Sequence, residues 1–372
     1  MSAAPTRAAP TRAAPTRAVV VTVVIETLVA LVVGAAFLGE RGLWLDEAFT
    51  WSTVDRPFPD LVRLLVTREG FQILHSLLMW PLVRISSTPV MLRSPSVVAF
   101  AAAVPAVWLA GRRLFDDRAG LCAGMLLVVN GLALQYAQEA RSYALAMMLC
   151  AYAAAFLAGE VNGHTRGGSR AWIVVSVLAV YAHGYAVLAI GAQAASVAFL
   201  PPGPARRRLV SGAVRIGLLA SPAAVLPLLH AGRADGGAWN DTTSLSTVRE
   251  LVWLFAGRTA TAIPVYAIGV GVALVAALIA WSRHGRSETA WRYGMPLMWL
   301  LLPVAVPLAV SLVEPIWHYR YALPSLGSLV VLAGYGLTRL EGRRLPAAVI
   351  ALALVLSARV SGSGVTTKEY RG

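Results

Sequence analysis

The chain has 372 residues, of which 58% are apolar and only 13% are charged, and its mean hydropathy is +0.67. Soluble domains carry about 25% charged residues, so this composition excludes that class. The formal net charge is +14. Because the arginines cluster between apolar runs, the positive-inside rule of membrane proteins explains this charge, and nucleic acid is not an expected partner. Cys122 and Cys150 both lie inside apolar runs, so neither a disulfide framework nor a zinc site is predicted.

The N-terminal residues 1–17 contain the sequence AAPTR three times in succession. This Pro-rich repeat predicts a disordered tail, and its arginines favour a cytoplasmic N-terminus. The apolar run that follows, residues 18–39, is longer than the core of a signal peptide and lacks a convincing small-residue cleavage site. We therefore expect an uncleaved first membrane span that runs outward.

Residues 40–93 form the most polar large segment and are predicted to be the first extracytoplasmic loop. Within this loop, residues 71–85 are apolar but too few for a membrane span, which needs about 20 residues. If they crossed the membrane, the cluster Arg112-Arg113 and its later counterparts would face outward. If they form an amphipathic helix in the membrane interface, every arginine cluster faces inward. We expect the interfacial helix.

The other apolar runs alternate with short polar connections and predict further spans. They are residues 94–111, 119–136, 143–159, 172–183, 185–200, 209–230, 262–281, 295–313, 323–339 and 345–360. With the first span they predict an all-α polytopic membrane protein of about eleven transmembrane helices. We expect residues 18–360 to form one transmembrane domain, with a second extracytoplasmic loop at 231–261 and an extracytoplasmic tail at 361–372. No second half repeats the first, which weakens an inverted-repeat transporter.

Four polar clusters fall on the predicted outer face. In the first, Asp46 and Glu47 are adjacent and are flanked by Trp44, Phe49 and Trp51. Partly buried carboxylates at a membrane surface are suited to accept a proton, so one could act as a base while its neighbour orients the acceptor. The alternative is a helix N-terminus that Asp46 caps, with the aromatic residues as interface anchors.

The second and third clusters supply a cation and an imidazole. Arg141 lies in the polar turn 135–143, where a guanidinium is costly unless paired and where its fork suits phosphate oxygens. The alternative is a local pair between Glu139 and Arg141. His183 joins two spans with almost no loop, and it could donate to a phosphate or position a sugar hydroxyl. The alternative there is a hydrogen-bonded interfacial histidine.

The fourth cluster, residues 314–321, compresses His318, Arg320 and three aromatic residues into one span boundary. This composition suits stacking on a sugar and binding an anion. The alternative is an aromatic belt with an arginine that extends to the interface. Glu26 and Arg215 lie inside spans, and for both we expect side chains that extend to the membrane surface.

Taken in order, these motifs resemble the GT-C superfamily of glycosyltransferases, most closely the bacterial family 39 branch that is related to protein O-mannosyltransferases and aminoarabinose transferases. The resemblance covers about residues 18–345 and rests on residues 44–48, 92–96, 111–115, 138–145, 181–185 and 320–321. It implies transfer of a sugar from a polyprenyl-phosphate-linked donor, not a nucleotide sugar, on the extracytoplasmic face and with inversion at the anomeric carbon.

The resemblance also implies roles for individual residues. Asp46 matches the general base, and Glu47 matches its partner. Arg141 and Arg320 match cations at the donor phosphate. Further candidates for binding the donor phosphate or sugar are Gln138, Tyr143, His183, Tyr185 and His318.

Two departures and two alternatives stay open. Residues 70–75 stand where the family has a His-Pro-Pro-Leu-Tyr-Tyr-like stretch, which leaves acceptor recognition open. Many relatives continue beyond the point where this chain stops, so both a truncated chain and a minimal enzyme fit. A transporter or flippase of a lipid-linked sugar would also need phosphate-binding arginines, although ionisable groups near the membrane midplane are expected of it. A non-catalytic subunit of a glycosylation complex is the second alternative.

The residues do not identify the sugar, or whether the acceptor is a glycan, a lipid or a protein. No cofactor is certain, and a divalent cation at the carboxylates stays open. The expected setting is the cytoplasmic (inner) membrane of a bacterium, in contact with membrane lipids, with the N-terminus in the cytoplasm and the active site outside.

Overall fold

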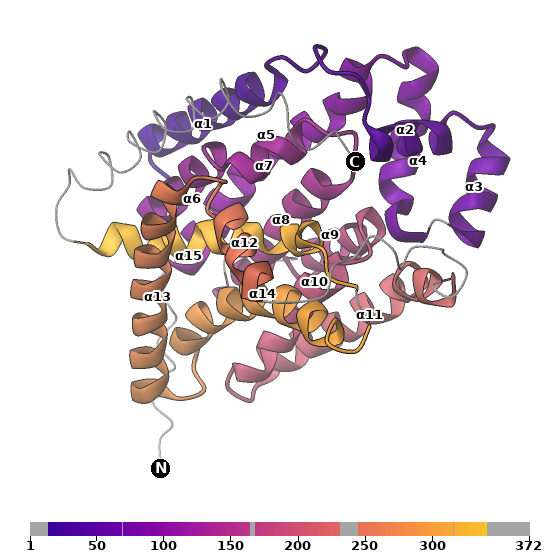
Figure 1. The fold of residues 1–372 in the computed structure, drawn as a ribbon. Coiled ribbons are helices and arrows are strands. Elements are labelled where there is room, and N and C mark those ends of the chain that lie inside the picture. Colours follow the sequence, from indigo (N-terminus) through magenta and orange to yellow (C-terminus); the bar gives the residue numbers. More distant parts are fainter. Residues whose placement is uncertain (1–13, 69, 164–167, 231–244, 315, 341–372) are drawn as a thin grey trace.

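The computed structural model describes residues 14–68, 70–163, 168–230, 245–314 and 316–340, and all the regular elements in these ranges are helices (Figure 1). They are α1 (Arg17–Ala35), α2 (Leu45–Val54), α3 (Phe58–Thr67), η1 (Gly70–Gln72), α4 (Ile73–Ile85), α5 (Pro89–Leu114), α6 (Asp117–Val128), α7 (Gly131–Ala137), α8 (Tyr143–Val161), α9 (Gly168–Ala182), α10 (Ala186–Ser196), η2 (Val197–Phe199), α11 (Pro204–His230), α12 (Leu245–Phe255), η5 (Ala260–Ala262), α13 (Ile263–His284), α14 (Glu288–Val310), η6 (Tyr319–Ser325) and α15 (Leu326–Arg339). The predicted all-α class is confirmed.

Seven of the described helical segments are long and apolar enough to cross a membrane: α1, α5, α8, α11, α13, α14 and the segment formed by η6 and α15. The pair α6 and α7 adds an eighth if it is counted as one bent span, and α9 and α10 are shorter apolar helices. Each span expected between residues 18 and 339 therefore coincides with a helix. The polytopic membrane architecture is confirmed, whereas the count of eleven is not, because α9 and α10 are shorter than the other candidate spans and the span expected at 345–360 lies outside the described residues.

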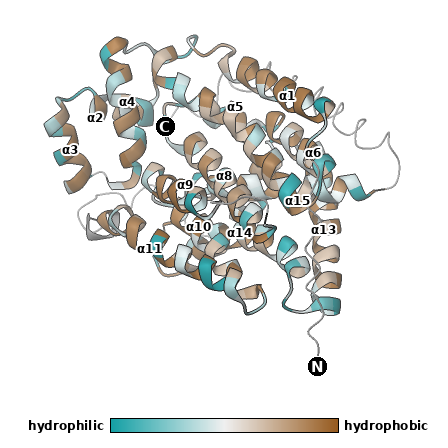
Figure 2. Cartoon of the chain, turned by 180° about the vertical axis from the view of Figure 1, so that it is seen from behind, coloured by the Kyte–Doolittle hydropathy of each residue, from teal (hydrophilic) through white to brown (hydrophobic). Residues whose placement is uncertain are grey.

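Apolar side chains cover the outside of the bundle as well as its core. Figure 2 shows hydrophobic residues along most of α1 and α13. Val24 of α1 is 51% exposed and Leu278 of α13 is 62% exposed, so both helices present apolar surface outward. Such surface is unfavourable in water and fits contact with lipid tails.

A sharp bend interrupts the segment that the sequence predicts as one span at 119–136. The helices α6 and α7 meet at 63°. Asn130 caps α7 by accepting from the backbone N–H of Ala133 at 3.0 Å, and its Nδ2 donates to the carbonyl of Phe255 at 2.9 Å and to the hydroxyl of Tyr266 at 3.2 Å. The side chain therefore stabilises the bend by bonding to a distant part of the chain.

The segment after α1 folds into three helices, α2, α3 and α4, that lie together at one side of the bundle (Figure 1). Helix α4 packs against α2, α5 and α9. It runs from Ile73 to Ile85, and it is not among the helices long enough to cross a membrane. Its placement in the membrane interface stays a prediction.

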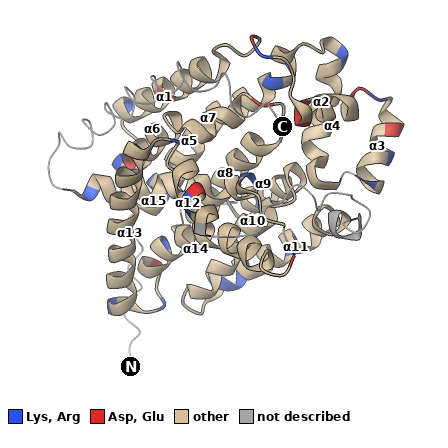
Figure 3. Cartoon of the chain, viewed as in Figure 1, with Lys and Arg blue, Asp and Glu red and all other residues tan. Residues whose placement is uncertain are grey.

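Arginines gather at the end of the bundle that lies away from this three-helix group. Arg93 and Arg113 stand at opposite ends of α5, about 30 Å apart given the rise of 1.5 Å per residue. Near Arg113, the guanidinium of Arg339 at the end of α15 bonds to Asp116 before α6. Figure 3 shows that charged residues are sparse along the middle of the long helices. The charges thus lie mainly toward the two ends of the long helices, and which end faces the cytoplasm stays a prediction.

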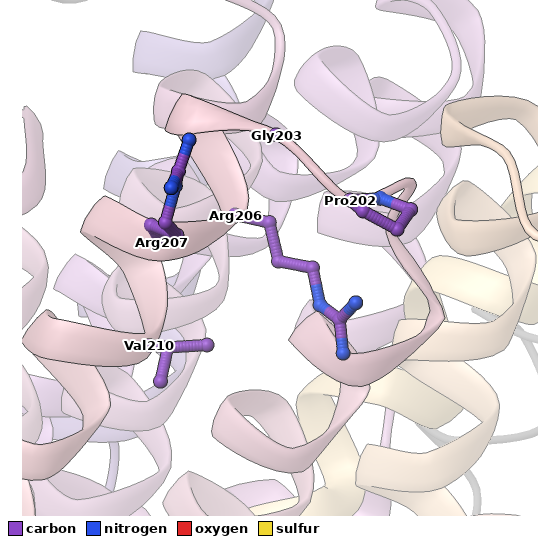
Figure 4. Close-up of a pocket in the computed structure, with 5 residues that line it drawn as sticks. All are labelled: Pro202, Gly203, Arg206, Arg207 and Val210. Atoms are coloured by element: carbon purple, nitrogen blue, oxygen red, sulfur yellow. The ribbon is translucent and has the colours of Figure 1, made fainter.

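A hollow at the start of α11 belongs to the arginine-rich end (Figure 4). It is lined by Pro202, Gly203, Arg206, Arg207 and Val210. Helices α9 and α11 run in the same direction, because Gly212 lies against Trp172 and the hydroxyl of Tyr181 donates to Leu219. The hollow is therefore remote from His183 at the far end of α9.

Glu26 does not extend to the membrane surface, so that prediction is wrong. The residue lies in the middle of α1 and is 4% exposed. Its Oε2 has no hydrogen-bond partner and packs against Gly124 of α6, where any side chain would collide with it. The absence of a side chain at Gly124 thus makes room for the carboxyl group between α1 and α6.

Candidate active site

Asp46 lies between two arginines. The Nη1 of Arg320 donates to the Oδ2 of Asp46 at 2.5 Å, and the Nη2 of Arg141 lies 3.9 Å from the same oxygen. Arg141 also donates from Nη1 to the backbone carbonyl of Asp46 at 3.4 Å and to the hydroxyl of Thr50 at 3.3 Å. The three charged side chains are 13 to 25% exposed, so the group is accessible yet partly screened from solvent.

Three distant parts of the chain meet at this carboxylate. Asp46 is in the first turn of α2, Arg141 is in the turn between α7 and α8, and Arg320 is in η6 just before α15. The sequence predicted that these residues share one face of the membrane. The structure brings them into contact, and it does not show the local pair between Glu139 and Arg141, because Arg141 turns toward Asp46.

Glu47 faces a different partner and is completely buried. Its carboxylate accepts from Nε and Nη2 of Arg93 at 2.8 and 2.6 Å, and from the backbone N–H of Ala140 at 2.8 Å. The N–H of Trp44 also donates to it at 3.3 Å, which closes a capping box at the start of α2. Glu47 therefore fixes the position of α2 and does not share the surroundings of Asp46.

Arg93 completes this anchor from α5. Its remaining N–H groups donate to the carbonyls of Leu38, Arg41 and Gly42 at 2.7, 3.0 and 2.8 Å. Although residues 92–96 carry part of the family resemblance, Arg93 was not among the predicted site residues. Arg93 directly precedes a predicted span, and an arginine at the membrane boundary needs a partner where it is buried, so its position could have identified it.

Gln138 also fastens the scaffold. Its Nε2 donates to the carbonyls of Ala36 and Gly34 at 2.8 and 3.3 Å, and its Oε1 accepts from Arg41 at 3.1 Å. Gln138 thus ties the turn before α8 to the end of α1. The structure does not bring it into the aromatic group described next.

The other predicted site residues form an aromatic group beside the arginines. The rings of Tyr185 and Tyr321 stack 4.1 Å apart at 6°. Tyr143 lies 4.9 Å from His183, and His318 lies 5.8 Å from Tyr321, measured between ring centroids. The guanidinium of Arg141 is 6.0 Å from the Tyr143 ring centroid. A flat aromatic surface therefore borders the cations.

Two histidines of this group are neutral hydrogen-bond donors. Burial, assisted by Arg141, lowers the pKa of His183 to about 3, and burial with Arg320 lowers the pKa of His318 to about 4. In each ring Nδ1 accepts a backbone N–H, from Tyr185 at 3.2 Å and from Arg320 at 3.4 Å. A neutral imidazole whose Nδ1 accepts carries its proton on Nε2, so both residues can donate to a ligand.

Glu139 is a buried acid next to the arginine pair. Its Oε1 accepts from Gln135 at 3.1 Å, and its Oε2 has no hydrogen-bond partner. Burial raises the pKa of Glu139 to about 7, against the opposing effect of the Gln135 hydrogen bond. Arg258 in turn donates to Gln135 at 2.5 Å. The sequence did not indicate Arg258, because only the fold brings the segment before α13 onto α7.

No protein-family model matches the sequence, and none of the curated proteins resembles it. Solved structures do share its fold. ArnT from Cupriavidus metallidurans matches in the apo state with a TM-score of 0.63 and 17% identity over 95% of this chain and 66% of that one. The complex of ArnT with undecaprenyl phosphate matches with a TM-score of 0.62 and 17% identity, over 96% of this chain and 67% of the ArnT chain. An oligosaccharyltransferase of Archaeoglobus fulgidus, in complex with an inhibitory peptide and a dolichol-phosphate, matches with a TM-score of 0.51 and 12% identity over 95% and 52%.

The chain has the GT-C fold. This finding confirms the resemblance that the ordered motifs predicted, at the level of the fold. The chain spans about two thirds of the length of ArnT and about half that of the archaeal oligosaccharyltransferase.

At this end of the GT-C fold, several buried polar atoms of the described residues have no hydrogen-bond partner. They include the Nε atoms of Arg141 and Arg320, the hydroxyl of Ser142 and both ring nitrogens of His75. An unpaired buried donor is costly, so the donors at this end are candidates for contact with acceptor atoms of a ligand. Within the described part of the chain, no three metal-ligating side chains gather in one place.

Proposed function

We propose that the protein is a membrane glycosyltransferase that moves a sugar from a polyprenyl-phosphate-linked donor to a hydroxyl or similar nucleophile on the extracytoplasmic face of a bacterial inner membrane. The observation that carries this proposal is the placement of Asp46 between Arg141 and Arg320, beside buried donors that lack partners. The complexes of the two structural neighbours with undecaprenyl phosphate and dolichol-phosphate support a lipid-linked donor.

Asp46 serves as the general base in this proposal. It takes the proton of the acceptor hydroxyl as the acceptor oxygen bonds to the anomeric carbon and the bond from that carbon to the phosphate oxygen breaks. The electron pair leaves with the phosphate, and Arg141 and Arg320 neutralise its charge. A phosphate held by two cations is an adequate leaving group, so no acid catalyst is required. Attack from the face opposite the phosphate inverts the anomeric carbon.

The surrounding residues position the reactants. His183 and His318 offer Nε2 donors to phosphate or sugar oxygens, and the stacked rings of Tyr185 and Tyr321 offer a flat apolar surface to the sugar. Glu47 positions Asp46 indirectly, because its pair with Arg93 fixes the first turn of α2.

A transporter of a lipid-linked sugar is favoured by one observation, the buried carboxyl of Glu26 in the middle of α1. The charged groups around Asp46 gather at one end of the bundle, which favours chemistry at a single face. A non-catalytic subunit would have no use for a carboxylate between two phosphate-binding cations.

A transfer assay tests the proposal. Membranes from cells that overproduce the protein are incubated with a panel of radiolabelled polyprenyl-phosphate sugars, and labelled acceptor is measured. We expect transfer from at least one donor and a loss of at least about 100-fold in Asp46→Asn, which keeps the shape and removes the base. Asp60→Asn on the exposed face of α3 is the matched control. Near-normal transfer by a folded Asp46→Asn variant would remove Asp46 from the mechanism, and movement of label across vesicles without transfer would favour the transporter.

A further inference from the structure

His75 is a buried imidazole with no assigned role. It lies in the first turn of α4, is 2% exposed, and neither of its ring nitrogens has a hydrogen-bond partner. Its neighbours Ile73 and Leu74 pack against the main hydrophobic core, so the turn that carries His75 is fixed. Polar side chains as buried as this one are normally hydrogen bonded, and two unsatisfied ring nitrogens point to a ligand.

The start of α4 belongs to the candidate active site. The backbone N–H of Gly184 donates to the carbonyl of Phe71 at 2.9 Å, and the ring of Phe71 stacks on Tyr185 with centroids 5.9 Å apart. These contacts hold η1, which leads directly into α4, against the turn that carries His183. His75 is also close enough to Arg141 for the guanidinium charge to act on it, and it acts in turn on His183.

The charge state of His75 limits what it can bind. Burial, with a smaller effect of Arg141, lowers the pKa of His75 to about 3, so the ring is neutral at physiological pH. A neutral imidazole has one donor and one acceptor nitrogen. Phosphate oxygens only accept near neutral pH, so a phosphate would leave the acceptor nitrogen unpaired. A sugar hydroxyl both donates and accepts, and neighbouring hydroxyls can satisfy both nitrogens.

We propose that His75 binds hydroxyl groups of the sugar that the donor carries, next to the phosphate held by Arg141. The inference rests on the proposed function. The transferred sugar is bonded directly to that phosphate, so its hydroxyls must lie beside the phosphate-binding arginine. His75 thereby selects for a hydroxylated sugar in the donor and has no direct role in binding the lipid phosphate.

Two probes separate sugar binding from phosphate binding. The purified full-length protein in lipid nanodiscs is titrated with undecaprenyl phosphate and with a panel of undecaprenyl-phosphate hexoses and pentoses. The sugar-bearing lipid that binds most tightly is then used as the probe for the variants. We expect His75→Phe to weaken binding of the sugar-bearing probe about 10-fold, as the loss of hydrogen bonds to hydroxyl groups would, and to leave binding of undecaprenyl phosphate unchanged. His75→Asn keeps a donor and an acceptor and should lose less. His284→Phe, exposed at the arginine-rich end, is the matched control.

The ratio of the affinity for the sugar-bearing probe to the affinity for undecaprenyl phosphate decides the result. Binding of undecaprenyl phosphate also shows whether each variant is folded. An unchanged ratio in both His75 variants overturns the proposal, as does a panel in which no sugar adds affinity over undecaprenyl phosphate. If His75→Phe does not fold, the ratio in His75→Asn carries the test. Failure of the proposed function is distinct, because it would show as the absence of sugar transfer from every donor in the transfer assay, whatever the ratio of the two affinities.

Discussion

Asp46 and Glu47 are consecutive residues, yet their carboxylates bind different arginines in different surroundings. Asp46 pairs with Arg320 at the accessible site, whereas Glu47 pairs with Arg93 in the interior. Successive residues of a helix point about 100° apart, so one turn of α2 can present one carboxylate to reactants and bury the other. The pair divides into a candidate base and an anchor for that base.

Glu47 and Arg93 should therefore stabilise the fold as a coupled pair. Removing one partner leaves a buried charge uncompensated, so Glu47→Ala should destabilise the protein by about 3 to 5 kcal/mol, whereas the double variant Glu47→Leu/Arg93→Met should lose less stability than the sum of its two single variants. Thermal unfolding in detergent measures both. Asp55→Ala, which breaks the exposed pair with Arg84, should cost about 1 kcal/mol or less. Equal losses of stability in the Glu47→Ala and Asp55→Ala variants would contradict the role of Glu47 in anchoring α2.

Arg141 should determine the affinity for the donor phosphate. Removing a charged partner of a partly buried phosphate costs about 2 to 5 kcal/mol, some 30-fold or more in affinity. Arg141→Lys should weaken donor use strongly, because lysine cannot copy a bidentate grip, and Arg141→Ala should weaken it more. Arg63→Ala, on the exposed face of α3, is the control and should leave the donor affinity unchanged. Arg233→Ala, which lies outside the described residues, should also change the donor affinity little. Donor titration of the variants decides, and unchanged affinity in Arg141→Ala would move the phosphate site to Arg320.

Glu139 should make stability depend on pH. Its pKa rises from 4.5 to about 7 in the folded protein because burial disfavours the charged form. The neutral acid therefore adds stability that is fully present below pH 4.5 and is lost as the pH rises through about 7. Glu139→Gln should reduce the pH dependence of the thermal unfolding midpoint between pH 4.5 and about 7. Glu250→Gln, on the exposed face of α12, should leave that pH dependence unchanged. The same slope in wild type and Glu139→Gln would show that another group titrates.

The placement of α4 in the interface can be tested by the sidedness of the next connection. A cysteine introduced by Asp116→Cys at the arginine-rich end should not react with a membrane-impermeant reagent applied to intact cells. Thr67→Cys, exposed at the end of α3, should react. Native Cys122 and Cys150 are buried and should give little background. Labelling of Asp116→Cys from outside would mean that α4 spans the membrane and that the later topology is reversed.

Apolar periodicity predicted the helices well, because a bilayer requires long apolar runs whatever their tertiary contacts. It missed the bend at Asn130, although the pair Asn130-Gly131 is a typical helix breaker, because the flanking residues are apolar. It also misjudged Glu26, whose burial depends on Gly124, a residue on another helix.

The candidate site was predictable in part. The residue types and the common face led to Asp46, Arg141, Arg320 and the aromatic group. Which arginine pairs with which carboxylate could not be predicted, because those contacts join residues as far apart as Asp46 and Arg320. His75 and Arg258 escaped notice for the same reason, since burial and partners are properties of the fold.

The hydrogen bonds between residues 255–258, before α13, and helix α7 have a consequence for protein engineering. Phe255 accepts from Asn130 at the start of α7, and Arg258 donates to Gln135 near its end, just before the turn that carries Arg141. Because these two hydrogen bonds tie α7 to residues 255–258, a chimeric protein must take both segments from the same parent. A chimera that replaces Phe255 or Arg258 without its partner on α7 would therefore loosen the turn that carries Arg141 and should weaken donor binding, although neither residue faces Asp46.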